Sequence, residues 1–243
     1  MQYCTVDQVK VRLGIASADT TQDAVIAQII LGVSDRFSGA EAAGRDLGIQ
    51  TVRNYLFDLP YRSQHIWLPT AYPVVAITSI KEAMFGQFDS YPELVENTDF
   101  QLNRLSGKIT RIGLQWFRGT GTVRITWQGG YTYASLWVSA GTYAVGVLCQ
   151  YDGLVYTCAS NVTGSATTPA ADTTHWTLLT GQVPLPDEIT DVAITQSVWD
   201  FNHRRTPGQT STSVNSASTG DAGTTTLLPG VKETLADYRR LLA

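Results

Sequence analysis

Apolar residues recur at helical spacing in two segments near the start of the chain. Thr5-Val6-Asp7-Gln8 forms a capping box, in which the threonine hydroxyl accepts from a backbone amide and the glutamine reaches back to the cap. A short apolar stripe follows and ends at Gly14: Val6, Val9 and Leu13. Residues 20–23 give a second capping signal. They predict another helix, with its apolar stripe at Ile26, Ile29, Ile30, Val33 and Phe37.

Between residues 54 and 127 the pattern changes to that of β-strands. Short segments rich in β-branched and aromatic residues are separated by Pro, Gly, Asn or Asp. Ser106-Gly107 predicts a tight hairpin, because glycine adopts the positive φ that such turns require. We therefore expect a small antiparallel sheet, built from Asn54–Phe57, His65–Leu68, Val74–Lys81, Phe100–Leu105, Lys108–Ile112 and Val123–Trp127.

Helical spacing returns after Pro184 and Pro186, where Asp187-Glu188 place acids at the positive end of a helix dipole. The apolar stripe of this third helix is Ile189, Val192, Ala193 and Trp199. Residues 206–226 are mostly Ser, Thr and Gly, and they predict a flexible arm that builds no packed core. A last helix is expected over 229–242, with its stripe at Val231, Leu235, Tyr238 and Leu242.

Residues 134–182 differ in composition from the rest of the chain. They contain no Lys, Arg or Glu, and their charged residues are Asp152 and Asp172. Gly, Thr and aromatic residues dominate, and the short apolar segments are separated by turns such as Asp152-Gly153. We predict a small all-β module inserted into an α+β frame of four helices and the antiparallel sheet, formed by residues 1–133 and 183–243.

Composition and charge exclude several classes of protein. The 243 residues are 43% hydrophobic and 16% charged, which is enough for one large domain or two small ones. A formal net charge of −4 leaves no global positive excess to hold nucleic acid. The apolar runs are far shorter than the ~20 residues that cross a bilayer, so we expect assembly in the cytoplasm and no membrane partner. Three cysteines do not make a disulfide framework.

No set of catalytic residues converges. His65, His175 and His203 lie in three different segments, and the sequence has no serine-hydrolase elbow, zinc-protease helix or phosphate-binding glycine loop. The spacing of the acids singles out no carboxylate pair of the kind that a glycosidase uses. We therefore expect a protein that is not an enzyme and needs no cofactor.

Short motifs recur in a fixed order along the predicted frame. They are Tyr3-Cys4-Thr5-Val6-Asp7-Gln8-Val9-Lys10 with Arg12-Leu13-Gly14, Pro73-Val74 before Ile77-Thr78-Ser79-Ile80, Phe100-Gln101-Leu102 with Gly107-Lys108-Ile109, Val123–Trp127 before Gly129-Gly130-Tyr131, Val183-Pro184-Leu185-Pro186-Asp187, Asn202-His203-Arg204-Arg205, and Leu228-Pro229-Gly230-Val231 before Tyr238-Arg239. In this order they resemble the head-tail connector (neck adaptor) proteins of tailed bacteriophages. The chain departs from that family between Tyr131 and Pro184, where the module stands, and at Asp35-Arg36-Phe37.

The resemblance implies a structural virion protein at the head-tail junction. It would form a homo-oligomeric ring, a dodecamer, beneath the portal protein, and would extend the DNA channel. Its partners would be the portal, a downstream neck or tail protein and, non-specifically, the passing DNA. In that family the C-terminal region engages the portal, which implies portal docking by Val231, Leu235, Tyr238, Arg239 and Arg240. The alternative is that the last helix folds back on its own bundle.

The order of residues in the module also follows a known pattern: Trp137, Tyr143, Gly146, Tyr151-Asp152-Gly153, Tyr156-Thr157-Cys158, Pro169 and His175-Trp176. It resembles small chitin- and cellulose-binding modules, except at Gly146-Val147, where those usually have Gly-Asp. Exposed rings stack on the C–H faces of sugars, so polysaccharide is a further expected partner. A sugar-binding adhesin or accessory protein is the alternative function. We expect Tyr143, Tyr151 and Tyr156 to be mainly structural and Trp137 and Trp176 to be exposed, because so small a module needs rings for its own core.

Two further groups of residues carry hypotheses. Cys149 and Cys158 have three interpretations. They are small core residues, or they form a disulfide once a virion leaves the reducing cytoplasm. As a third possibility they bind zinc with His175, but the sequence lacks the Cys-x-x-Cys spacing and a fourth ligand for such a site. Residues 100–130 hold five basic residues and no acid: Arg104, Lys108, Arg111, Arg118 and Arg124. These predict contact with an acidic neighbouring subunit or with DNA in a channel. The alternative is a solvated face of the sheet.

Overall fold

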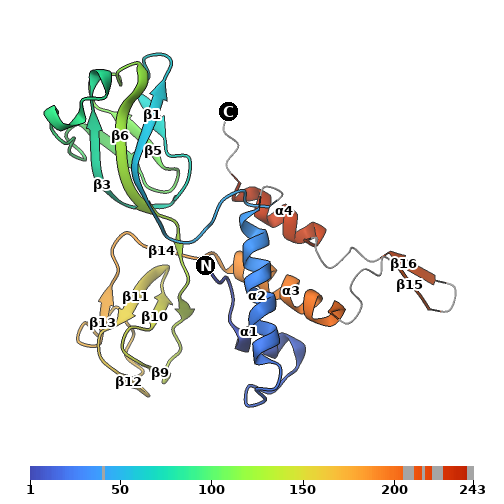
Figure 1. Ribbon diagram of the computed structural model, residues 1–243. Helices are drawn as coiled ribbons and strands as arrows, with labels where there is room; N and C mark the ends of the chain where they lie inside the picture. The colour runs from blue at the N-terminus through green and yellow to red at the C-terminus, as the bar shows by residue number, and fades with distance from the viewer. Residues whose placement is uncertain (40–41, 205–210, 215–216, 221–226, 240–243) are drawn as a thin grey trace. The chain divides into compact units, whose positions relative to one another are not determined.

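The computed structural model describes residues 1–39, 42–204, 211–214, 217–220 and 227–239. The fold is α+β, and the chain divides into two compact units (Figure 1). A helical unit comprises residues 1–46 and 185–243, and a β unit comprises residues 47–184. The predicted boundaries of the inserted module lie within the β unit and stay a prediction.

The helical unit contains α1 (Val6–Leu13), α2 (Asp23–Ser38), α3 (Asp187–His203) and α4 (Pro229–Asp237). The predicted capping box is confirmed, because the Gln8 N–H donates to Thr5 Oγ1 at 3.2 Å and the Thr5 N–H donates to Gln8 Oε1 at 2.8 Å. Gly14 ends α1 with a φ of 71°. The second predicted cap is wrong. The N-cap of α2 is Gln22, which makes no side-chain capping bond, and the backbone amide and hydroxyl of Thr21 both donate to Asp19 Oδ1.

One apolar core joins the helices of this unit. The α2 stripe is buried at Ile26, Ile30, Val33 and Phe37, and α3 adds Ile189, Ala193 and Phe201. Helix α4 runs antiparallel to α3, because the Leu228 N–H donates to Gln196 Oε1 at 2.8 Å near one end and the Tyr238 hydroxyl donates to Glu188 near the other. Val231 and Leu235 are buried by this packing.

The six predicted strands form two three-stranded antiparallel sheets, where one sheet was expected. The first has the order β1 (Gln50–Leu59), β6 (Gly119–Gly129), β3 (Val74–Glu82), and the second has the order β2 (His65–Trp67), β5 (Lys108–Arg111), β4 (Phe100–Asn103) (Figure 1). Each sheet has one apolar face, and the two faces bury each other. Their shared core includes Ile66, Ile80, Phe100, Ile109, Trp116, Ile125 and Trp127.

The end of β6 passes very close to the backbone of two other segments. A Cβ added at Gly129 would lie 1.8 Å from the Ala71 carbonyl oxygen. Gly130 has a φ of 118°, and a Cβ there would lie 2.1 Å from the Gly48 carbonyl oxygen. Neither position has room for a side chain, which gives the Gly-Gly-Tyr motif a steric reason.

Residues 131–184 form short strands: β7 (Tyr131–Thr132), β8 (Ser135–Leu136), β9 (Thr142–Tyr143), β10 (Leu148–Tyr151), β11 (Leu154–Cys158), β12 (Val162–Thr163), β13 (Trp176–Leu178) and β14 (Val183–Pro184). Four of them form a sheet in the order β13-β11-β10-β8, and β12 pairs with β9. The parallel pair of β7 with β14 joins the two ends of this segment, and the Thr132 hydroxyl donates to Gln182 Oε1 at 2.8 Å beside it.

Four short elements complete the fold. Two 3₁₀ turns, η1 (Met84–Gly86) and η2 (Phe88–Ser90), follow β3. Part of the segment predicted as a flexible arm forms an antiparallel hairpin of β15 (Ser211–Val214) and β16 (Ala217–Gly220). A backbone ladder needs no apolar core, so Ser and Thr are compatible with it. The remaining residues of the predicted arm lie outside the described ranges.

Candidate functional site

Three loops meet at one end of the two-sheet sandwich, and we call residues 58–64, 82–90 and 112–121 together the loop end. Hydrogen bonds donated by backbone N–H groups hold them to one another. The Trp116 N–H donates to the Ser63 carbonyl at 2.8 Å, and the Phe117 N–H donates to Glu82 Oε1 at 2.5 Å. The Ala83 N–H donates to the Thr122 carbonyl at 2.9 Å. The loop end is therefore a defined surface and not a set of independent loops.

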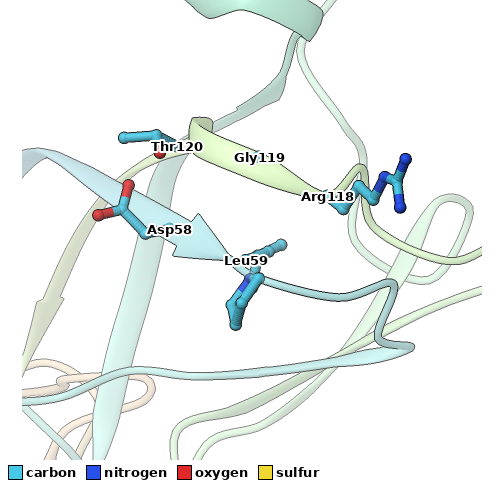
Figure 2. Close-up of a pocket in the computed structure, with 6 residues that line it drawn as sticks. Asp58, Leu59, Arg118, Gly119 and Thr120 are labelled. Atoms are coloured by element: carbon cyan, nitrogen blue, oxygen red, sulfur yellow. The ribbon is translucent and has the colours of Figure 1, made fainter.

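Three hollows indent this surface, with volumes of about 530, 620 and 780 Å³. The first lies where β1 ends and β6 begins, and Figure 2 shows Arg118 extending away from Asp58 there. Asp58 Oδ1 accepts from the Gly121 N–H at 2.7 Å, so this carboxylate fixes a turn. The second hollow is lined by Arg62, Leu114 and Phe117 among others, and the third by Leu56, Phe88 and Arg124 among others. None of the three shows a nucleophile with an adjacent base among its lining residues.

A buried ion pair between the two sheets lies next to the loop end. Arg111 Nε lies 3.3 Å from Glu82 Oε2, and the two side chains are 9% and 6% exposed. Arg111 Nη1 also donates to the Asp99 carbonyl at 2.6 Å, and its guanidinium lies over the Trp116 ring. These contacts join β3, β5 and the segment that precedes β6.

Large apolar side chains stand exposed on the loop end. Tyr61 is 70% exposed, Leu114 61% and Met84 47%. Arg62 and Arg118 are also exposed, and within the part of the chain that the structure describes neither guanidinium has an ion-pair partner. The sequence interpretation missed these residues except Arg118. The available signal was a large apolar residue inside a turn segment, as in Pro60-Tyr61-Arg62 and Gly113-Leu114.

The five basic residues of 100–130 are not gathered on one face. Arg111 is buried, Arg104 Nη2 donates to both carboxylate oxygens of Glu96 at 3.0 Å, and Arg124 lies 3.7 Å from Asp89 and over the Phe88 ring. Lys108 lies over the Trp67 ring at 5.4 Å. Acids from other segments thus pair with three of the five basic residues. Contact with DNA or a neighbouring subunit stays a prediction, and Arg111 is unavailable for it.

The aromatic residues of the predicted module mostly form its own core. Trp176 is 2% exposed, so its expected exposure is wrong: its ring packs edge-on against Tyr143 with centroids 5.0 Å apart. Tyr143 and Tyr156 are buried, as expected of structural residues. Trp137 and Tyr151 are half-buried and form an edge-on pair at 5.5 Å. Sugar binding stays a prediction that now depends on these two rings.

The cysteines of the module are buried free thiols in the structure. Cys158 Sγ donates to the Ser160 carbonyl at 3.0 Å. His175 is committed to Asp172, with Nδ1 2.9 Å from the carboxylate, and no group of three potential metal-ligating side chains occurs among the residues that the structure describes. The positions fit the interpretation as small core residues, and a disulfide stays a prediction.

Burial raises the pKa of Cys149 from 9.0 to about 11. The folded chain therefore holds the neutral thiol at pH values where the unfolded chain has lost its proton, so this contribution to stability is present below about pH 9 and disappears as the pH rises towards 11. We expect the advantage of wild type over Cys149→Ala in the free energy of unfolding to shrink across this range. Urea unfolding at several pH values measures it; an advantage that stays constant would contradict the prediction.

The residues predicted to dock on the portal occupy the helical unit. Val231 and Leu235 are buried there, and the Tyr238 hydroxyl donates to Glu188. Arg239 is exposed, and Arg240 lies outside the described residues. In this structure α4 adopts the alternative arrangement, folded back on its own bundle. Docking on a portal stays a prediction, and through this stripe it would require α4 to leave α3.

No protein-family model and no curated protein matches the sequence. Among solved structures, the chain is similar to one described as "Neck of empty GTA particle computed with C6 symmetry". The two share 14% sequence identity, with a TM-score of 0.47, over 98% of this chain and 90% of that chain. Among the described helices, none combines the length and apolar character that crossing a bilayer requires.

Proposed function

We propose that this chain is a non-enzymatic structural subunit of the neck of a tailed phage or phage-like particle. It would form a ring beneath the portal, extend the DNA channel and receive the next neck or tail protein. Assembly would take place in the host cytoplasm. Binding and ordering are the whole of its mechanism.

One observation carries this proposal: the motifs that resemble the connector family lie where helices begin and where backbone segments pass closest to each other. Thr5 and Gln8 start α1, Pro186 starts α3, and Pro229 starts α4. Gly129 and Gly130 occupy the closest backbone approach in the β unit. Residues that set helix ends and chain crossings specify an architecture, so their order along the chain supports a shared fold more strongly than surface residues would.

Immunogold electron microscopy of intact virions tests the location. We expect an antibody against residues 134–182 to place gold at the head-tail junction, because a module pointing into the channel would obstruct DNA. Loss of the gene product should leave heads without attached tails. Gold absent from the junction, with tails attached normally in its absence, would refute the neck role.

The half-buried Trp137–Tyr151 pair favours one second candidate, a sugar-binding role of the module. The two roles predict different particle locations. Gold at the tail tip, together with retention of the protein on insoluble chitin or cellulose that Trp137→Ala abolishes, would support the adhesin.

A further inference from the structure

We propose that the loop end of one copy docks on an acidic face of the helical unit of a second copy, in a head-to-tail contact. This inference rests on the proposed ring. The loop end presents Tyr61, Met84 and Leu114 to solvent beside the unpaired Arg62 and Arg118. Apolar side chains grouped with arginines on a surface held by hydrogen bonds are typical of a protein-protein interface.

The complementary surface lies on α3 and α4, and we call it the acidic face. Three exposed acids follow one another at helical spacing in the first turns of α3, and α4, antiparallel to it, adds two more: Asp187, Glu188, Asp191, Glu233 and Asp237. Arg12 forms an ion pair with Asp191 on this face, and the neighbouring Val11 is exposed.

The distribution of charge between the units agrees with this assignment. Acidic and basic residues are equal in number in the β unit, so the net charge of −4 belongs entirely to the helical unit. Among the exposed charged side chains of the loop end, Asp58 accepts the Gly121 N–H and Asp89 lies 3.7 Å from Arg124, whereas Arg62 and Arg118 have no ion-pair partner among the described residues. An acidic surface that carries an apolar residue is thus available on every copy of the chain.

The same charges select the symmetry of the contact. Two loop ends facing each other would offer Arg62 and Arg118 only carboxylates that are already engaged, Asp58 with the Gly121 N–H and Asp89 with Arg124, and two acidic faces would oppose carboxylates, so both isologous dimers are disfavoured. A loop end docked on an acidic face instead brings arginines opposite carboxylates and apolar side chains opposite Val11. That contact is heterologous, so each copy keeps one free surface of each kind, and repetition closes a ring when the rotation per subunit fits.

Charge reversal on the purified full-length chain tests the contact. A loop-end variant carries Arg62→Glu and Arg118→Glu, and an acidic-face variant carries Glu233→Lys and Asp237→Lys. Asp191 and Glu188 are left intact because they hold Arg12 and Tyr238. Arg53→Glu, an exposed arginine on β1 away from the loop end, is the matched control. Circular dichroism checks that each variant folds, and analytical ultracentrifugation reports the oligomeric state.

We expect wild type and the Arg53 control to associate, and each reversed variant alone to lose association by at least about 10-fold. An equal mixture of the two variants should associate again, because each loop end then meets an acidic face of opposite charge. Wild type that remains monomeric at high concentration, reversed variants that associate like wild type, or a mixture that shows no rescue would each overturn the contact. Gold at the neck of virions in that case would leave the proposed function standing, so the two failures are distinguishable.

Discussion

Replacing Arg111 with alanine is expected to lower the free energy of unfolding of the β unit by about 3–5 kcal/mol. The substitution leaves the Glu82 carboxylate buried without its cation, and a buried unpaired charge costs far more than an exposed one. It also removes the donor to the Asp99 carbonyl and the cation over Trp116. Urea unfolding followed by tryptophan fluorescence measures the change.

A second arginine of the same sandwich provides the control. Arg104 pairs with Glu96 just as directly, at 3.0 Å, but the two side chains are 42% and 30% exposed. Arg104→Ala should therefore cost no more than about 1 kcal/mol. The double substitution Arg111→Met with Glu82→Met should recover part of the loss, because removing both partners leaves no isolated charge. Equal costs for the two alanine variants would contradict the role assigned to burial.

Replacing Gly130 with alanine should destabilise the β unit by about 4 kcal/mol or more. Two effects combine: a side chain is strained at a φ of 118°, and its Cβ would meet the Gly48 carbonyl oxygen at 2.1 Å. The nearest obstructing atoms all belong to the backbone, so no side chain can rotate away. We expect soluble expression to fall sharply, and urea unfolding of the surviving protein to give a lower midpoint.

Gly113→Ala separates the two effects. Gly113 also has a positive φ, 68°, but no atom lies within 4 Å of a Cβ built there. Its cost should be that of backbone strain alone, about 1–2 kcal/mol. If Gly130→Ala is no worse than Gly113→Ala, the close approach of the backbones is not what requires glycine at position 130.

Local patterns predicted the elements because those elements are determined by neighbouring residues. The capping box at Thr5, the stop at Gly14 and the alternation of Val123, Ile125 and Trp127 all refer to contacts within a few residues or on one strand face. What the patterns could not supply was pairing across the chain. The strands divide into two sheets because β6 accepts β1 and β3 on its two sides while β5 pairs with β2 and β4.

The candidate site was less accessible to prediction for the same reason. The same limit applies to Lys10: it is a charged residue, yet it is buried, with Nζ donating to the Ser17 carbonyl at 2.8 Å and lying 2.9 Å from Asp23. Arg111 was expected to contact a partner, but its partner Glu82 is 29 residues away in the sequence. Exposure of Tyr61 and Leu114 depends on which loops converge, and composition does not reveal that.

The pairing of β7 with β14 has an evolutionary consequence. Val183 lies opposite Tyr131 in a parallel pair, so the segment between these two strands begins and ends at neighbouring positions, about 4.8 Å apart. The residues between these strands therefore form a segment whose two ends are held together by the β7–β14 pairing. Evolution could exchange or remove this segment without changing the register of the strands in the sandwich. A fluorescent or affinity domain could be inserted between the same two strands.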